Sequence, residues 1–306
     1  MCIFNKNIIW GILLIIHSSA QLVSAASQPT VFILNSNRSI EKYSLAETSF
    51  KSAYSGEIKS FNLKKINIKE DGAANLLNPR HEDLIYCIGS KALLFATKNF
   101  PDNKILVSSA VNGERLKSNS EIYRISEQVP LETQLTNIKM IFSFIKKIGI
   151  IYSPEYNEKW VENAGKEART FGIEINGRPY DKSDSVENVL SELLSVVDAI
   201  LLIPDPGAIT KSSFNKMMKT SNAMKKPIIA YSPVFVKEGA VLSISIDDKT
   251  VGNQAAMLAE RIINKEKIES KRQHPAGSYT ALNLKKIKEF NLRVNENLFL
   301  ASINIF

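Results

Sequence analysis

Small polar side chains stand where several apolar runs of this sequence end, at places where a buried strand would give way to a helix. Gly89 and Ser90 follow one run and open a helical pattern, and Ser108 and Ser109 follow the next run. The first N–H groups of a helix attract anions, and glycine lets a ligand approach the backbone. The first junction could therefore bind a carboxylate, helped by serine hydroxyl groups. The open alternative is a plain strand-to-helix turn with a serine cap.

Asp205 is the most informative single residue, because its carboxylate follows the apolar run 200–204. A buried carboxylate without a partner costs several kcal/mol, so this side chain should either face solvent in a turn or hold a partner. Pro204 and Pro206 restrict the backbone on both sides, which would suit a rigid acceptor for a ligand ammonium group. On that hypothesis, Asp205→Ala would abolish binding and leave thermal stability nearly unchanged.

Tyrosines end two further apolar runs in the second half of the chain. Tyr152, followed by Ser153, ends one run, and Tyr231 ends another. A tyrosine at the edge of a cleft can stack on a ring or hydrogen-bond a polar ligand, although it could equally cover a hinge. Glu238 precedes a glycine and could be a hinge group or a binding group.

A helix N-terminus in one half of the chain and a carboxylate in the other half would together hold a zwitterion. The hypothesised ligand is therefore an amino acid or a similarly small amphoteric molecule, and the two tyrosines favour an aromatic one. The residues that we expect to bind it are Gly89, Ser90, Ser108, Ser109, Tyr152, Ser153, Asp205, Tyr231 and Glu238.

Signatures of catalysis are missing from the sequence. It contains no phosphate-binding G-x-x-x-x-G-K-[ST], no H-E-x-x-H zinc motif, no C-x-x-C pair and no G-x-S-x-G nucleophile elbow. His81 and His274 stand alone in polar stretches, where a histidine is usually just solvated. We therefore expect no catalytic residue, no metal site and no cofactor, and we expect that the protein is not an enzyme.

Apolar runs and helical periods alternate along the chain, which indicates an α/β fold with parallel sheets. The stretch 146–154, KKIGIIYSP, is a short apolar run bounded by turn residues, which is typical of a strand buried on both faces. A helical pattern follows, with Trp160, Ala164 and Ala168 about one turn apart, and ends at Gly172. In such sheets, ligands bind outside the carboxyl ends of the strands.

The same plan occurs twice, so we expect two Rossmann-like lobes with parallel sheets joined by a hinge. Residues 26–128 would form the first lobe, together with a C-terminal return segment at about 247–306. Residues 129–246 would form the second lobe, and the first crossing would lie at 128–130. The amphipathic stretch 131–145 then leads into the KKIGIIYSP strand.

The first 25 residues are typical of a secretory signal peptide. Lys6 precedes a nine-residue apolar block at 8–16, and small residues stand before an expected cleavage near Ala25. A membrane anchor is the alternative, but the block has about half of the ~20 residues that a span needs. Cleavage would leave Cys87 as the single cysteine, most simply a buried small hydrophobe, in a periplasmic protein without internal disulfides.

The chain is basic, with a formal net charge of +8 that becomes +7 once the signal segment and Lys6 are removed. Its lysines are scattered in pairs along the sequence, and no aromatic-and-basic nucleic-acid motif accompanies them. We therefore expect a solvated basic surface, suited to an acidic partner or an anionic envelope, and no nucleic-acid partner.

Five stretches carry a resemblance to a known family. They are 83–90 with Ala92, 147–154, 197–205, 226–231 with 236–240, and 247–256 leading to 282–285. In this order they resemble the periplasmic substrate-binding proteins of ABC transporters with the type I fold. They are most similar to the ABC transporter substrate-binding protein group that includes tryptophan binders. The segment 110–121 departs from the family, whose members have a longer glycine-bearing loop there, so the identity of the ligand stays open.

The resemblance implies a monomer that closes on a small-molecule ligand by hinge motion and hands it to an ABC permease in the membrane. A ligand sensor of the same fold, signalling to a membrane receptor or kinase, is the first alternative. An exported enzyme on a doubly wound scaffold is a second alternative, disfavoured by the missing motifs.

Overall fold

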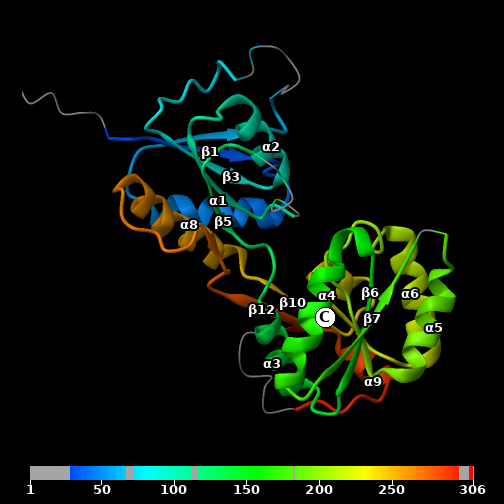
Figure 1. Cartoon of the computed structure of the whole chain (residues 1–306). Coiled ribbons are helices and arrows are strands. Elements are labelled where there is room, and N and C mark those ends of the chain that lie inside the picture. Colours follow the sequence, from blue (N-terminus) through cyan, green and yellow to red (C-terminus); the bar gives the residue numbers. More distant parts are fainter. Residues whose placement is uncertain are drawn as a thin grey trace, which may run out of the picture.

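The computed structural model describes residues 28–66, 72, 74–111, 113, 116, 118–181 and 183–295, and the backbone of 303–305. The expected signal peptide at 1–25 lies outside these described residues. Within the described part, no helix combines the length and the apolar character that crossing a membrane requires. The described chain forms two lobes, each built around its own sheet (Figure 1).

The first lobe contains a six-stranded sheet with the order β11-β5-β4-β3-β1-β2, in which all neighbours are parallel. Its strands are β1 (Val31–Asn35), β2 (Ile58–Asn62), β3 (Leu84–Ile88), β4 (Lys104–Ser108), β5 (Ile122–Ile125) and β11 (Arg272–Gln273). Its helices are α1 (Glu41–Ala53), α2 (Ser90–Asn99) and α8 (Asp248–Ile263).

The second lobe contains a seven-stranded sheet with the order β13-β12-β10-β9-β8-β6-β7, parallel except where β12 runs against β10. Its strands are β6 (Lys147–Tyr152), β7 (Glu174–Pro179), β8 (Ala199–Leu201), β9 (Ile228–Ala230), β10 (Leu242–Ile246), β12 (Ser278–Leu282) and β13 (Ile303–Ile305). Its helices are α3 (Leu131–Ile141), α4 (Pro154–Thr170), α5 (Val186–Val196), α6 (Lys211–Met224), α7 (Pro233–Lys237) and α9 (Leu284–Glu289).

Each central strand is buried on both faces, as its continuous apolar run predicts. In β1, Val31 and Ile33 pack on the side of α1, whereas Phe32 and Leu34 pack on the side of α2. Cys87 of β3 is fully buried on the α2 side as a free thiol, which confirms its expected role as a small hydrophobe. Burial in this apolar layer raises the pKa of the thiol, so it stays protonated.

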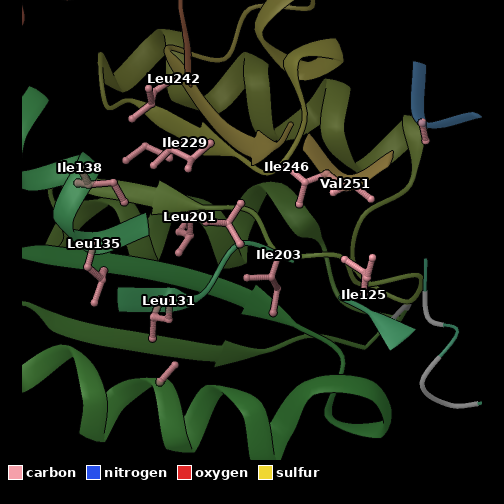
Figure 2. Close-up of a cluster of buried hydrophobic side chains, with 14 of the residues drawn as sticks. Ile125, Leu131, Leu135, Ile138, Leu201, Ile203, Ile229, Leu242, Ile246 and Val251 are labelled. Atoms are coloured by element: carbon pink, nitrogen blue, oxygen red, sulfur yellow. The ribbon is translucent and has the colours of Figure 1, made fainter. Parts of the chain in front are cut away.

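The chain passes between the two sheets three times, after β5, after β10 and after β11. A large apolar cluster continues through this region (Figure 2): Ile125 ends β5, Ile246 ends β10, and Val251 follows in α8. The same cluster includes Leu131 and Leu135 of α3, which cover one face of the second sheet. Apolar side chains are therefore packed at the ends of the strands that lead into the hinge.

The C-terminal return segment divides between the lobes, where we expected all of 247–306 to join the first. Helix α8 packs along α1 and β11 extends the first sheet, as expected, but β12 and β13 join the second sheet. The reason lies in β12, which pairs antiparallel with β10 and places Leu282 opposite Leu242. Both leucines are buried, so β12 covers an edge that β10 would otherwise leave open.

A glycine permits the close contact between α1 and α8. A β-carbon on Gly252 of α8 would collide with the backbone carbonyl of Ala46 and with the side chain of Ser49, both in α1. Gly165 of α4 offers a comparison, because a β-carbon there would meet nothing within 4 Å.

We expect opposite effects from alanine at these two helical glycines. Gly165→Ala should raise the free energy of unfolding by roughly 0.5–1 kcal/mol, because alanine is the better helix former. Gly252→Ala should lower it by about 1–3 kcal/mol, because the overpacked helices must separate. Urea unfolding of both variants measures the difference. A stabilised Gly252→Ala protein would contradict the close packing of α1 on α8.

Candidate functional site

A cleft of about 200 Å³ lies between the lobes, bounded by residues of both. The first lobe contributes the ends of β4 and β5 and the short strand β11, including Arg124, Glu127 and Arg272. The second lobe contributes the start of α4 and the segment after β8, including Trp160 and Pro204. Both walls are thus built by the carboxyl ends of parallel strands and the segments that follow them, which is where ligands of such sheets bind.

The second-lobe wall presents one face of helix α4. Tyr156 and Trp160 are four residues apart and so lie on the same side of the helix, with Asn157 beside them. Tyr156 is exposed at 36%, whereas Trp160 is half-buried and packs against the large apolar cluster. Two aromatic side chains on one helical face provide a surface against which a ring could stack.

Hydrogen bonds to Asp205 connect the two segments that form this wall. The Asp205 carboxylate is 3% exposed and accepts four hydrogen bonds, two on each oxygen. Oδ1 accepts from the backbone N–H groups of Gly207 and Ala208, each at 2.8 Å. Oδ2 accepts from the Ser153 N–H at 2.8 Å and from Asn157 Nδ2 at 2.7 Å. The carboxylate therefore links the loop after β8 to the first turn of α4.

This geometry corrects the expectation that Asp205 is free to accept a ligand ammonium group. Its partners are backbone and amide N–H groups, so the hydrogen bonds that a buried carboxylate needs are supplied by the protein itself. Its role is to position Asn157 and the neighbouring aromatic side chains. For the same reason, we no longer expect Asp205→Ala to leave the thermal stability unchanged.

The predicted first-lobe residues lie beside the cleft wall and contact one another. The Gly89 N–H donates to the carbonyl of Ser108, and Ser90 Oγ donates to the carbonyl of Val111 at 2.9 Å. Ser108 Oγ is hydrogen-bonded to the hydroxyl of Tyr86 at 2.7 Å, and both side chains are buried. The cleft is bounded here by Val111 and its neighbours, while these serine hydroxyl groups serve the fold.

Gly89 and Ser109 both adopt the left-handed backbone region. Gly89 has a φ of 90°, and a β-carbon there would collide with Ser36 and Tyr43. Ser109 has a φ of 55°, its side chain is fully buried, and its hydroxyl has no hydrogen-bond partner among the described residues. The conformation of the turn therefore requires Gly89. This supports the alternative that the junction at Gly89 and Ser90 is a plain strand-to-helix turn.

The predicted second-lobe residues are more dispersed. Tyr152 is 8% exposed and belongs to the large apolar cluster, where burial, Glu158 and Glu162 raise its pKa. Glu238 is exposed at the end of α7. Tyr231, by contrast, lines a hollow. A second hollow of about 10 Å³ reaches it and shares Glu127, Gln128, Trp160 and Pro204 with the cleft.

Sequence reasoning missed the charged and aromatic residues of the cleft. Tyr156 and Trp160 carried a usable signal, because their spacing places both on one helical face, but we used Trp160 only as part of the helical pattern that it forms with Ala164 and Ala168. Arg124 alternates with buried neighbours along β5, as a residue facing away from the core would. Glu127 and Arg272 carried no local signal, because tertiary contacts alone bring them to the cleft.

A partly buried cluster of charged side chains lies beside the hinge, at Lys42, Glu127 and Asp248. Lys42 Nζ of α1 contacts Glu127 Oε1 at 2.6 Å, while Glu127 Oε2 and Asp248 Oδ1 are buried without a hydrogen-bond partner among the described residues. Burial and the charge of Glu127 raise the pKa of Asp248 to about 7. Burial lowers the pKa of Lys42, but the Glu127 carboxylate more than offsets this, so the lysine stays charged. The cluster joins α1, the crossing after β5 and the start of α8.

We expect Asp205→Ala to destabilise the protein by about 1–3 kcal/mol or more, because buried N–H donors lose their acceptor. Urea unfolding measures this loss, with Asp102→Ala as the control because Asp102 is an exposed aspartate in a turn of the first lobe. If both variants unfold at the same urea concentration as the unaltered protein, Asp205 does not fasten the wall.

The raised pKa of Asp248 makes stability depend on pH. Between roughly pH 4 and pH 7, the Asp248 carboxyl group ionises in the unfolded chain but stays protonated in the folded one. The free energy of unfolding is therefore highest, as far as this group is concerned, below about pH 4, and it falls as the pH rises toward 7. We expect Asp248→Asn to melt at a higher temperature than the unaltered protein at pH 8, with the gap closing by pH 4. A gap that widens as pH falls would contradict the raised pKa.

Comparisons with known proteins agree with this architecture. The family model described as "ABC transporter substrate binding protein" matches residues 47–304. A tyrosine-binding protein of Clostridioides difficile (strain R20291) is 29% identical over 191 residues, which cover 60% of this chain and 55% of that protein. The match thus spans about half the length of this curated relative.

Two solved structures show the same fold. An ABC domain from Streptococcus pneumoniae in complex with L-Trp has a TM-score of 0.61 and 18% identity, covering 92% of this chain and all of that one. A ligand-free, open substrate-binding protein with adhesive properties from Clostridium difficile has a TM-score of 0.68 and 19% identity, covering 91% of this chain and 99% of that one. The expected type I periplasmic binding protein fold is confirmed. The chain belongs to the ABC transporter substrate binding protein family, and it is a substrate-binding protein rather than an enzyme.

Proposed function

We propose that this protein captures a small, amino-acid-like solute with an aromatic ring in the interlobe cleft and delivers it to an ABC permease. The observation that carries the proposal is the composition of the cleft. One wall presents Tyr156 and Trp160, and the other presents Arg124, Glu127 and Arg272. Together they offer a surface for a ring and groups of both charges for a zwitterion.

The dimensions of the cleft favour a small solute. Its volume of about 200 Å³ lies below the roughly 300–1,000 Å³ of pockets that hold drug-sized ligands. Because the two walls belong to different lobes, a ligand that contacts both would favour the closed arrangement of the hinge. We therefore expect the two lobes to close around the bound solute.

The relatives support the aromatic character of the ligand. One is a tyrosine-binding protein, and one solved structure contains L-Trp. Both ligands combine an aromatic ring with an α-amino acid group. The face formed by Tyr156 and Trp160 is the feature of this chain that matches such a ring.

Export and the interaction with the permease belong to the same proposal. The apolar block 8–16 after Lys6 supports a signal peptide cleaved near Ala25, and hence a periplasmic location. The protein would act as a monomer whose first lobe begins at residue 26 and whose second begins at 129. Family membership supports delivery to a permease over signalling to a receptor.

Trp160 provides a direct test of the cleft. The chain contains two tryptophans, Trp10 and Trp160, so a protein that starts at Ala26 retains Trp160 alone. We expect L-tyrosine to change the fluorescence of Trp160, and to stabilise the fold by ~2.7 kcal/mol at ~100 times its dissociation constant. We expect Trp160→Ala to lose most of this stabilisation and Phe144→Ala, at an exposed aromatic residue of the second lobe, to keep it.

Thermal shifts against a panel of aromatic amino acids, purines, sugars and small carboxylates complete the test. Shifts with sugars alone would refute an amino-acid ligand while leaving a binding protein. Equal shifts in the unaltered and Trp160→Ala proteins would refute binding at this cleft.

A further inference from the structure

Two arginines face each other across neighbouring strands at the cleft. Arg124 of β5 and Arg272 of β11 are partners in the register of this parallel pair, and both line the cleft. The backbone fixes this pairing, because the Arg124 N–H donates to the Lys271 carbonyl at 2.6 Å and the Ser126 N–H donates to the Gln273 carbonyl at 2.9 Å. The two guanidinium groups therefore stem from adjacent positions on one face of the sheet.

Like charges in opposed positions on neighbouring strands destabilise a sheet. Strand β11 consists of Arg272 and Gln273 alone, and it reaches β5 only after the chain has crossed to the second lobe and returned. The fold thus brings a second cation to the place where Arg124 already lies. An anion between the two side chains would turn this cost into a favourable interaction.

Arginine is well suited to such a role. Its planar guanidinium group offers several N–H donors in a fixed fork that matches the two oxygens of a carboxylate. Arg124 is half-buried and Arg272 is exposed, so the pair spans from the wall of the cleft to its opening. Neither side chain is without protein contacts, so a ligand carboxylate would add to the contacts that each already makes.

A carboxylate of the opposite charge lines the same cleft. Glu127 comes three residues after Arg124, and its Oε1 contacts Lys42 while its Oε2 is buried without a hydrogen-bond partner among the described residues. The lining of the cavity thus combines a pair of arginines with a carboxylate that has one buried oxygen without a hydrogen-bond partner among the described residues. Tyr156 and Trp160 lie on the facing wall.

We propose that Arg124 and Arg272 together bind the carboxylate of the ligand, and that Glu127 Oε2 accepts a hydrogen bond from its ammonium group. This assignment rests on the proposed function and defines its substrate class as α-amino acids that carry both charges. It places the anion site on β5 and β11, where the sequence had suggested the junction at Gly89 and Ser90.

The test compares three ligands that differ by one charged group. L-Tyrosine carries both groups, tyramine lacks the carboxylate, and 3-(4-hydroxyphenyl)propionate lacks the ammonium group. Calorimetric titrations use the unaltered protein, Arg124→Gln, Arg272→Gln and Glu127→Gln. Arg178→Gln is the control, because Arg178 pairs with Glu192 at an exposed site of the second lobe. Melting curves verify that each variant is folded.

The unaltered protein and Arg178→Gln should prefer L-tyrosine to tyramine by roughly 10–100-fold, the range expected of a charge-assisted hydrogen bond. Arg124→Gln and Arg272→Gln should lose most of this preference. Glu127→Gln should keep it but lose the preference for L-tyrosine over 3-(4-hydroxyphenyl)propionate. If the unaltered protein binds L-tyrosine and the arginine variants keep the full preference over tyramine, the arginine site is refuted while the proposed function stands.

A second measurement decides the case in which neither L-tyrosine nor any other aromatic amino acid binds, which would refute the proposed function. Inorganic sulfate is titrated against the melting temperature of the unaltered protein, Arg272→Gln and Arg178→Gln. A larger rise in the unaltered and Arg178→Gln proteins than in Arg272→Gln would retain the paired-arginine anion site for a different solute. Equal rises of the melting temperature in all three proteins would indicate a general salt effect only, and would refute the arginine site as well.

Discussion

The direction of the strands is the constraint on which this molecule depends. Parallel strands place all of their carboxyl ends at one edge of a sheet, so every loop that follows them leaves from that edge. Each lobe turns such loops toward the cleft, where the segment after β5 meets the start of α4 and the segment after β8. The polar groups that contact a ligand can therefore differ from one such protein to another while the two sheets stay unchanged.

Local hydrogen bonding determines which of those polar groups remain open to a ligand. Ser108 ends β4 and Asp205 follows β8, but their side chains already contact the hydroxyl of Tyr86 and backbone N–H groups, respectively. The groups that line the cleft instead come from a helical face, at Trp160, and from the hinge, at Glu127. A position at the end of a strand thus indicates closeness to the site, whereas a role in binding also requires that the side chain is not already committed to the fold.

Much of the fold could be predicted from the sequence, because buried parallel strands and amphipathic helices leave continuous local patterns. The strand at 147–152 and the helix that follows it are examples. The pairing of β11 with β5 could not be predicted, because two residues carry no periodicity. The antiparallel pairing of β12 could not be predicted either, because it depends on which edge of β10 stays open. The site was only partly predictable, since Arg272 reaches it by tertiary contacts alone.

The return of α8 and β11 to the first lobe affects the order in which the protein can fold. Helix α1 is made early in synthesis, but the helix that covers it ends at Ile263, and the sheet edge at β5 is completed only at Gln273. Contacts between residues so far apart in sequence form slowly, because a long loop must close first. A nascent chain would therefore expose the apolar face of α1 until almost all of it had been synthesised. Such a delay would keep the chain extended for longer, which would suit the export that we propose for this protein.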